Sequence, residues 1–228
     1  MILDTVAALE VLKHCDIRVA RSRFVDSAED ALEFATRRDA PDPRFVPIVL
    51  RRDGGSDSGR ADAVSGESVL ANEAAVRQVY AELADGAGTG KILAQVATPR
   101  GTDVRFAGRT DSREGKVLGV YDETRHIERM VPLGDAGAEY LAANVFAHGH
   151  RGPTEQGLRM LEHLLARISA FYEEADVMAL RIVVRLHENS YTVIDAEISA
   201  PRALHFNRKL AAHAHDRKGA DFHSSGRQ

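Results

Sequence analysis

The sequence has no tryptophan, a single cysteine and only 6% aromatic residues, and its formal net charge is −4. Proteins that bind nucleic acid present a basic surface with aromatic stacking platforms, so we expect no nucleic-acid partner. Cys15 has no second cysteine with which to form a disulfide inside this chain. Its place in the apolar run 6–15 predicts a packed thiol rather than a nucleophile.

No apolar run reaches the length of a membrane-spanning helix, and the first residues lack the basic start of a signal peptide. We therefore expect a cytoplasmic protein with no membrane partner. Hydrophobic residues make up 44% of the 228 residues and charged residues 28%, which is typical of folded globular proteins. Wholesale disorder is not expected.

Strand and helix patterns are interspersed without a strict strand–helix–strand rhythm, which favours the α+β class. The strongest helix signal spans 154–173, where leucines and aromatic residues recur at intervals of three and four. Two further helices are predicted after the capping residues Ser27 and Asn72. The remaining predictions are helices at 5–14 and 134–146 and strands at 45–50, 92–97, 103–107, 116–120 and 127–133. The segment 53–68, rich in Gly, Ser and Asp, is predicted to be a mobile loop.

The stretch 179–199 predicts a β-hairpin, because two β-branched runs flank a short polar break. A three-residue loop at 188–190 would place His187 opposite Tyr191. Alternation then puts Thr192, Ile194, Ala196 and Ile198 on the apolar face of the second strand.

The same register places two acids on one strand face of an otherwise apolar sheet. Arg181 lies across from Glu197, and Val183 lies across from Asp195. Because carboxylates on a half-buried face require a counter-charge, we expect the Arg181 guanidinium to contact both acids.

Two motifs resemble functional sites, a phosphate-binding loop and a metal site, but neither has the full set of residues that such a site requires. The run 86–91, Gly-Ala-Gly-Thr-Gly-Lys, has Asp85 where a phosphate loop needs glycine, and Ile92 where it needs serine or threonine. We interpret it as the end of a helix. His213 and His215 could bind a metal, but no third ligand is evident, so a solvated basic helix end is favoured. No catalytic residue can be assigned.

The order of several motifs resembles the ATP-grasp domain of nucleoside-diphosphate-forming acyl-CoA synthetases. The β chain of ADP-forming acetate–CoA ligase is the nearer resemblance and the succinyl-CoA synthetase β chain the more distant. The resemblance extends from about residue 6 to residue 208. The segments that carry it are 16–19 (Asp-Ile-Arg-Val), 47–51 (Pro-Ile-Val-Leu-Arg), 92–95 (Ile-Leu-Ala-Gln), 99–104 (Pro-Arg-Gly-Thr-Asp-Val), 149–152 (Gly-His-Arg-Gly), 194–198 (Ile-Asp-Ala-Glu-Ile) and 203–206 (Ala-Leu-His-Phe).

The resemblance implies a two-lobed ATP-grasp fold, with lobes at 1–91 and 92–215. The polar composition of the last residues predicts a flexible tail at 216–228. The resemblance implies ATP or ADP with Mg²⁺ as cofactor, held between the lobes. It also implies a partner, an α-like subunit that supplies the CoA-binding and phosphohistidine parts; a homo-oligomer is the other expected association. The residues it assigns to the nucleotide are Arg51, Gln95, Asp103 and Arg151, and those it assigns to the metal are Asp195 and Glu197.

The chain also departs from the family pattern. Arg51 replaces a lysine, Val96 replaces the hinge glutamate, and 52–72 contains no histidine where the family has a second phosphohistidine. Arg181 and Val183 stand where the family has an acid and an asparagine for Mg²⁺. Two functions therefore remain open: a nucleotide-binding subunit or domain of an acid–CoA ligase, or a catalytically lapsed relative that serves as a protein-binding or regulatory module.

Overall fold

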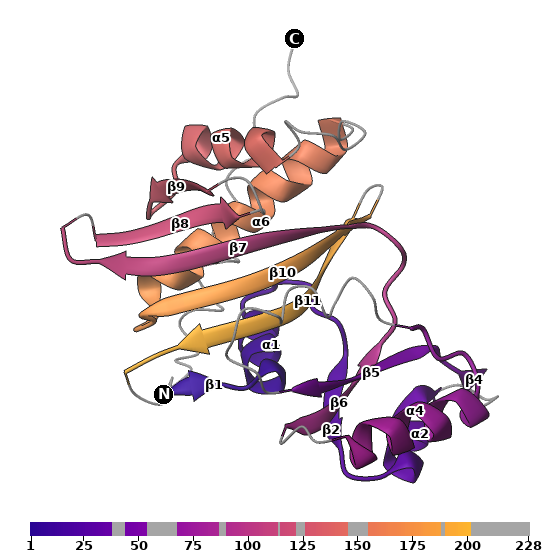
Figure 1. Cartoon of the computed structure of the whole chain (residues 1–228). Helices are drawn as coiled ribbons and strands as arrows, with labels where there is room; N and C mark the ends of the chain where they lie inside the picture. Colours follow the sequence, from indigo (N-terminus) through magenta and orange to yellow (C-terminus); the bar gives the residue numbers. More distant parts are fainter. Residues whose placement is uncertain are drawn as a thin grey trace.

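The structure, a computed structural model, describes residues 1–37, 44–53, 68–86, 90–113, 115–121, 126–145, 155–187 and 190–201. Figure 1 shows two main sheets of unequal size, each with its own helices; the short segments 36–37 and 44–45 pair as a further two-stranded sheet. In chain order the elements are β1 (Ile2–Leu3), α1 (Thr5–His14), β2 (Ser22–Val25), α2 (Ala28–Ala35), β3 (Thr36–Arg37), β4 (Arg44–Phe45), β5 (Ile48–Asp53), α4 (Glu73–Asp85), β6 (Lys91–Val96), β7 (Thr102–Asp111), β8 (Gly115–Tyr121), β9 (His126–Met130), α5 (Asp135–Val145), α6 (Glu155–Glu174), β10 (Ala179–His187) and β11 (Ser190–Ser199).

The larger sheet has six strands in the order β1-β11-β10-β7-β8-β9, and all of its described pairings are antiparallel. Helices α1, α5 and α6 share one hydrophobic core with one face of this sheet, and Figure 1 shows α6 crossing behind it. The 3.6-residue pattern predicted for α6 explains this packing, since Leu161, Leu165 and Ile168 are fully buried. By strand pairing and alternation, the opposite face carries charged side chains, among them Arg105, Arg181 and Glu128.

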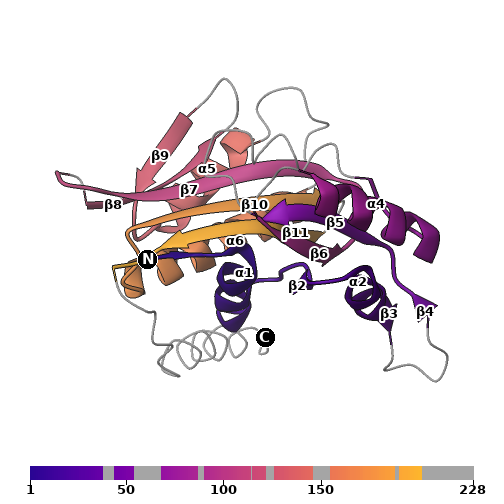
Figure 2. The same ribbon diagram turned by 60° about the horizontal axis from the view of Figure 1, so that its bottom comes forward.

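The smaller sheet has three strands in the order β2-β6-β5, and α2 and α4 cover one of its faces. Its core is separate from that of the larger sheet and includes Val25, Ile48, Leu50 and Ile92. Figures 1 and 2 show this unit lying next to the β10–β11 hairpin. Residues 97–101 carry the chain from one sheet to the other.

Helices begin where the sequence supplies a side-chain oxygen for the first free backbone N–H groups. Asp4 caps α1, Ser27 caps α2 and Asn72 caps α4, each accepting from the backbone N–H three residues further on. The predicted helices and strands are all present, with ends displaced by a few residues. None of the described helices is long and apolar enough to cross a membrane.

The hairpin register is confirmed at one end and wrong at the other. Arg181 pairs with Glu197 and Val183 with Asp195, as predicted. His187, however, pairs with Ser190 instead of Tyr191, so the strands are one residue out of the predicted register beside the loop.

A β-bulge reconciles the two ends of the hairpin. Val183 pairs with Asp195 and Val184 pairs with Val193, which leaves Ile194 as the extra residue. The predicted faces of β11 are therefore wrong on the loop side of the bulge: Val193 joins the main core, while Ile194 packs with Ala20 and Val183 on the other side.

The predicted lobe limits stay a prediction, and segments cross them. β1 belongs to the larger sheet although it lies in 1–91, and β6 belongs to the smaller sheet although all of it but Lys91 lies in 92–215. The described residues do not include the predicted loop (except Asp53 and Ser68), the tail 216–228, His213, His215 or Arg151.

Candidate functional site

The two sheets are joined by an ion pair between residues that the resemblance assigns to different ligands. Arg51, on β5, donates from its terminal NH2 group to Asp195 Oδ1 on β11 at 3.1 Å. The side chains are only 11% and 10% exposed, respectively. The residue expected to meet phosphate thus contacts the residue expected to bind metal. Since both are largely withdrawn from water, this contact is stronger than an ordinary surface ion pair.

The hydroxyl of Thr5 joins the same cluster from the first turn of α1. Its Oγ1 lies 2.8 Å from Asp53 Oδ1 and 3.1 Å from Asp195 Oδ1, and Thr5 is fully buried. A hydroxyl donates one hydrogen, so it bonds one carboxylate at a time. A polar cluster with two carboxylates and one guanidinium therefore lies where α1, β5 and β11 meet.

The bulge in β11 supplies a second connection between the sheets. Ile194, the extra residue, accepts at its carbonyl oxygen from Gln95 Nε2 at 2.8 Å and from Arg51 at 3.3 Å. Gln95 is 5% exposed and also donates to Ser22 Oγ at 2.8 Å. Two of the four residues that the resemblance assigns to the nucleotide, Arg51 and Gln95, thus lie side by side on one carbonyl at the junction of the sheets.

Asp103, a third residue that the resemblance assigns to the nucleotide, has a different partner; Arg151, the fourth, lies outside the described residues. Asp103 forms a two-point ion pair with Arg185, at 2.7 and 2.8 Å, and Arg185 also donates to Thr98 Oγ1 at 3.1 Å. Through these contacts Arg185, on strand β10, holds the segment that connects the two sheets. Whether Asp103 contacts a nucleotide stays a prediction.

The expectation for Arg181 is wrong. Its side chain is exposed, and within the described parts of the chain it forms no hydrogen bond or ion pair with Asp195 or Glu197. The cation that meets Asp195 is Arg51, which approaches from the smaller sheet rather than along the hairpin.

Mg²⁺ requires about six oxygen ligands in near-octahedral geometry, of which proteins generally supply one or two carboxylates. The residue paired with Asp195 on β10 is Val183, which offers no side-chain oxygen, and Asp195 Oδ1 already accepts from a guanidinium. Among the described residues there is no group of three or more histidines, cysteines or acids that could hold a metal ion. The cluster offers one further carboxylate, that of Asp53, but the Arg51 guanidinium lies on the Asp195 oxygen that would ligate Mg²⁺, and this disfavours the ion there.

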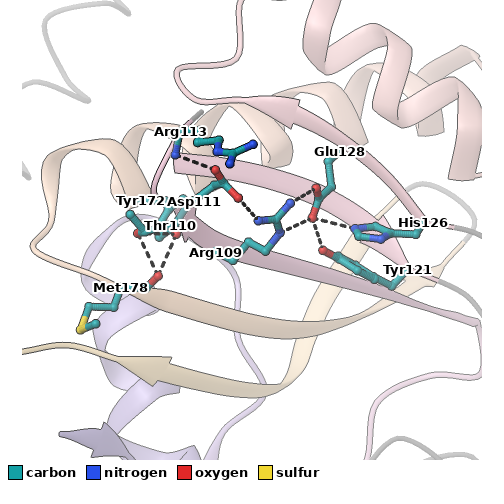
Figure 3. A network of polar contacts seen from close by, with 9 residues as sticks. All are labelled: Arg109, Thr110, Asp111, Arg113, Tyr121, His126, Glu128, Tyr172 and Met178. Carbon is teal, nitrogen blue, oxygen red and sulfur yellow. Dashed lines mark hydrogen bonds and ion pairs between the residues drawn. The ribbon is translucent and has the colours of Figure 1, made fainter. Parts of the chain in front are cut away.

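A second polar cluster lies towards the opposite edge of the larger sheet, and no sequence pattern predicted it. Figure 3 shows Glu128 on β9 surrounded by Arg109, Tyr121 and His126. Arg109 donates to both carboxylate oxygens, at 3.0 and 2.8 Å, and the Tyr121 hydroxyl donates to one of them at 2.6 Å. His126 Nε2 is 2.6 Å from the same oxygen, and its ring stacks on Tyr121.

These contacts shift two ionisation equilibria. The hydrogen bonds from Arg109 lower the pKa of Glu128 to about 2, against the opposing effect of burial, with smaller contributions from Tyr121 and His126. Burial, reinforced by Glu128, raises the pKa of Tyr121. The only signal in the sequence is the alternate spacing of His126 and Glu128 on one strand face, which is common in surface strands.

Cys15 is a packed thiol, as predicted. It is half-buried against the main core, and burial, with Glu174 and Asp16, raises the pKa of its thiol to about 11. A thiol that stays protonated at neutral pH is a poor nucleophile.

The sequence matches no known protein family, and no curated protein is significantly similar to it. Solved structures are similar. An acetyl-coenzyme A synthetase of Ca. Korarchaeum cryptofilum, in complex with coenzyme A, Ca-AMPCP and HgCl+, superposes with a TM-score of 0.69 and 21% identity, over 87% of this chain and 93% of that chain. A protein of Pyrococcus horikoshii Ot3 superposes with a TM-score of 0.67 and 16% identity, over 90% of this chain and 92% of that chain.

An ATP citrate lyase from Methanothrix soehngenii, in complex with citrate and coenzyme A, gives a TM-score of 0.58 and 12% identity, over 91% of this chain but only 50% of that chain. Identities at this level show a shared fold. The predicted α+β, two-lobed ATP-grasp fold is therefore confirmed.

Proposed function

We propose that this chain is the nucleotide-binding ATP-grasp part of an acid–CoA ligase of the nucleoside-diphosphate-forming type. The observation that carries the proposal is the likeness to the acetyl-coenzyme A synthetase chain, which extends over nearly the whole length of both chains. Structures of that enzyme contain coenzyme A and, in two cases, a nucleotide analogue with a metal ion, Ca-AMPCP in one and Mg-AMPPCP in the other. The proposed ligand here is ATP or ADP.

The proposed nucleotide position is the junction of the two sheets. Arg51 lies there with its guanidinium turned towards the larger sheet, and Gln95 lies beside it. An arginine recognises phosphate by charge-assisted hydrogen bonds, which makes Arg51 the proposed phosphate ligand. Asp103 and Arg151 are further proposed contacts on the strength of the resemblance alone.

The proposed assembly includes a second protein or domain. The resemblance assigns coenzyme A binding and the phosphohistidine to an α-like subunit, and 52–72 of this chain contains no histidine. The chain alone should therefore form no acyl-CoA from ATP, coenzyme A and acetate or succinate. Steady thioester formation by the purified chain would contradict this part of the proposal.

Calorimetric titration with ATP tests the binding proposal. The wild type should bind ATP, and Arg51→Ala should weaken binding by about tenfold, because a charge-assisted hydrogen bond to phosphate contributes about 1.5 kcal/mol or more. Arg109→Ala removes a comparable arginine on the far side of the larger sheet and should leave the affinity unchanged. Equal affinities in all three proteins would remove Arg51 from the site.

A second candidate function is favoured by the Arg51–Asp195 ion pair itself. Residues that would hold phosphate and metal neutralise each other, and Val183 offers no ligand. We propose, as the alternative, a catalytically lapsed module that binds another protein. Absence of any heat of ATP binding in a folded wild type would favour this alternative.

A further inference from the structure

Asp195 stands at the position that the resemblance gives to a metal ligand, yet its contacts are those of a counter-ion. Its Oδ1 atom is 3.1 Å from both the Arg51 guanidinium and the Thr5 hydroxyl. Asp195 is 7% exposed and Thr5 is fully buried. A carboxylate in this setting is held by donors from two other elements, α1 and β5, and the donors converge on one oxygen.

A divalent cation at that oxygen would have an arginine beside it. Two like charges in a region withdrawn from water repel strongly, and the neighbouring Val183 supplies no oxygen to offset the repulsion. The guanidinium supplies one of the two positive charges that Mg²⁺ would bring, and it does so at the same carboxylate oxygen.

A carboxylate and a phosphate offer a guanidinium the same kind of acceptor, namely paired anionic oxygens in a plane that its N–H groups match. An incoming phosphate and Asp195 therefore compete for the same donor. The carbonyl of Ile194 is neutral, so it accepts from Arg51 and Gln95 whether the anionic partner of Arg51 is Asp195 or phosphate. The bulge therefore keeps the guanidinium at the junction while its anionic partner changes.

We propose that Asp195 is a positioning residue that holds Arg51 at the junction of the sheets and competes with nucleotide phosphate for it, so that Asp195 lowers the affinity of the site for polyphosphates. This inference depends on the proposed function, since it assigns the ligand class, a polyphosphate anion, to the same site. If Asp195 competes with phosphate, its removal should raise the affinity for nucleotide. If Asp195 were a metal ligand, its removal would instead weaken binding of a metal–nucleotide complex.

The Asp195→Asn variant separates the two roles. The amide has nearly the same shape as the carboxylate, and its oxygen still accepts from Thr5 and Arg51, but the negative charge is gone. Burying a guanidinium with less counter-charge is unfavourable, and a bound anion relieves it. The variant should therefore gain more from an anion than the wild type does.

The experiment is a calorimetric titration of wild type and Asp195→Asn with ATP and with inorganic pyrophosphate, each with EDTA and with excess Mg²⁺. Asp195→Asn should bind both ligands about tenfold more tightly in EDTA, the change that one hydrogen bond between charged groups produces. Glu128→Gln is the matched control: it removes the carboxylate of another arginine ion pair, separated from β11 by three strands, and should bind like the wild type.

Weaker ATP binding by Asp195→Asn, confined to the Mg²⁺ titration, would identify a metal ligand and overturn the inference, as would unchanged affinity in EDTA. Absence of binding in every protein would instead overturn the proposed function. If Asp195→Asn does not fold, nitrogen-15 NMR of the wild-type arginine side chains gives the answer. The Arg51 signal, assigned with Arg51→Lys, should move with pyrophosphate and stay in place with Mg²⁺ alone; the opposite response contradicts competition.

Discussion

Glu128 gives the sharpest stability prediction, because one carboxylate receives donors from three residues. The change Glu128→Gln removes the negative charge while keeping one acceptor oxygen for Arg109 and Tyr121. Arg109 loses a two-point ion pair and retains Asp111, which its other terminal nitrogen contacts at 2.9 Å. We expect the fold to persist with a lower free energy of unfolding.

The pKa of Glu128 sets the magnitude. Its fall from 4.5 to about 2 corresponds at full strength to about 3 kcal/mol of stability. The Arg109 side chain is 45% exposed and that of His126 is 51% exposed, so solvent screening reduces this to about 1–2 kcal/mol. Because the folded-state pKa is depressed, the stabilisation is complete above pH 4.5 and is lost as the pH falls towards 2.

Urea unfolding of wild type and Glu128→Gln at pH 7 and pH 3 tests this reasoning. The wild type should be more stable by about 1–2 kcal/mol at pH 7, and the difference should fall below half at pH 3. Glu155→Gln is the control, since Glu155 and its partner Arg159 are exposed on a helix and such pairs contribute about 0.3–0.5 kcal/mol. A difference at pH 3 as large as that at pH 7 would refute the electrostatic explanation.

Two further substitutions test packing at the sheet and at its connection. Lys116→Met should cost about 1 kcal/mol in urea unfolding, because the ammonium donates to the last carbonyls of α6 and to Ala175 O at 2.8 Å, and these partly buried or exposed acceptors lose a charged donor. Gly101→Ala should cost about 3 kcal/mol, since its Cβ would lie 2.0 Å from the Leu186 carbonyl oxygen. Gly134→Ala, where a Cβ meets nothing within 4 Å, is the control, and equal melting temperatures for the two alanine variants would contradict the steric account.

Much of the hairpin could be predicted from the sequence because alternation fixes faces and cross-strand pairs locally. The pairing of Arg181 with Glu197 follows from two short runs of apolar residues and the break between them. The bulge at Ile194 could not be predicted in this way. Its carbonyl is used by Gln95 and Arg51, so the reason for the extra residue lies in contacts with a different sheet.

The same limit explains the error over Arg181. The sequence showed that Asp195 needs a positive partner and offered the nearest arginine on the paired strand. The partner is Arg51, which is 144 residues away along the chain and becomes a neighbour only when the smaller sheet docks on the hairpin. Local periodicity carries no information about that docking. The family resemblance carried some of this information, because it assigned Arg51 and Asp195 to one ligand-binding cleft between the lobes.

The central claim is that nucleotide phosphate meets Arg51 at the junction of the two sheets. A crystal structure of the chain with a non-hydrolysable ATP analogue tests it most directly. The account predicts a phosphate oxygen at about 3 Å from the Arg51 guanidinium, with the Arg51–Asp195 contact lengthened or shared. A nucleotide bound elsewhere, or an Arg51–Asp195 contact unchanged at saturating analogue, would contradict it.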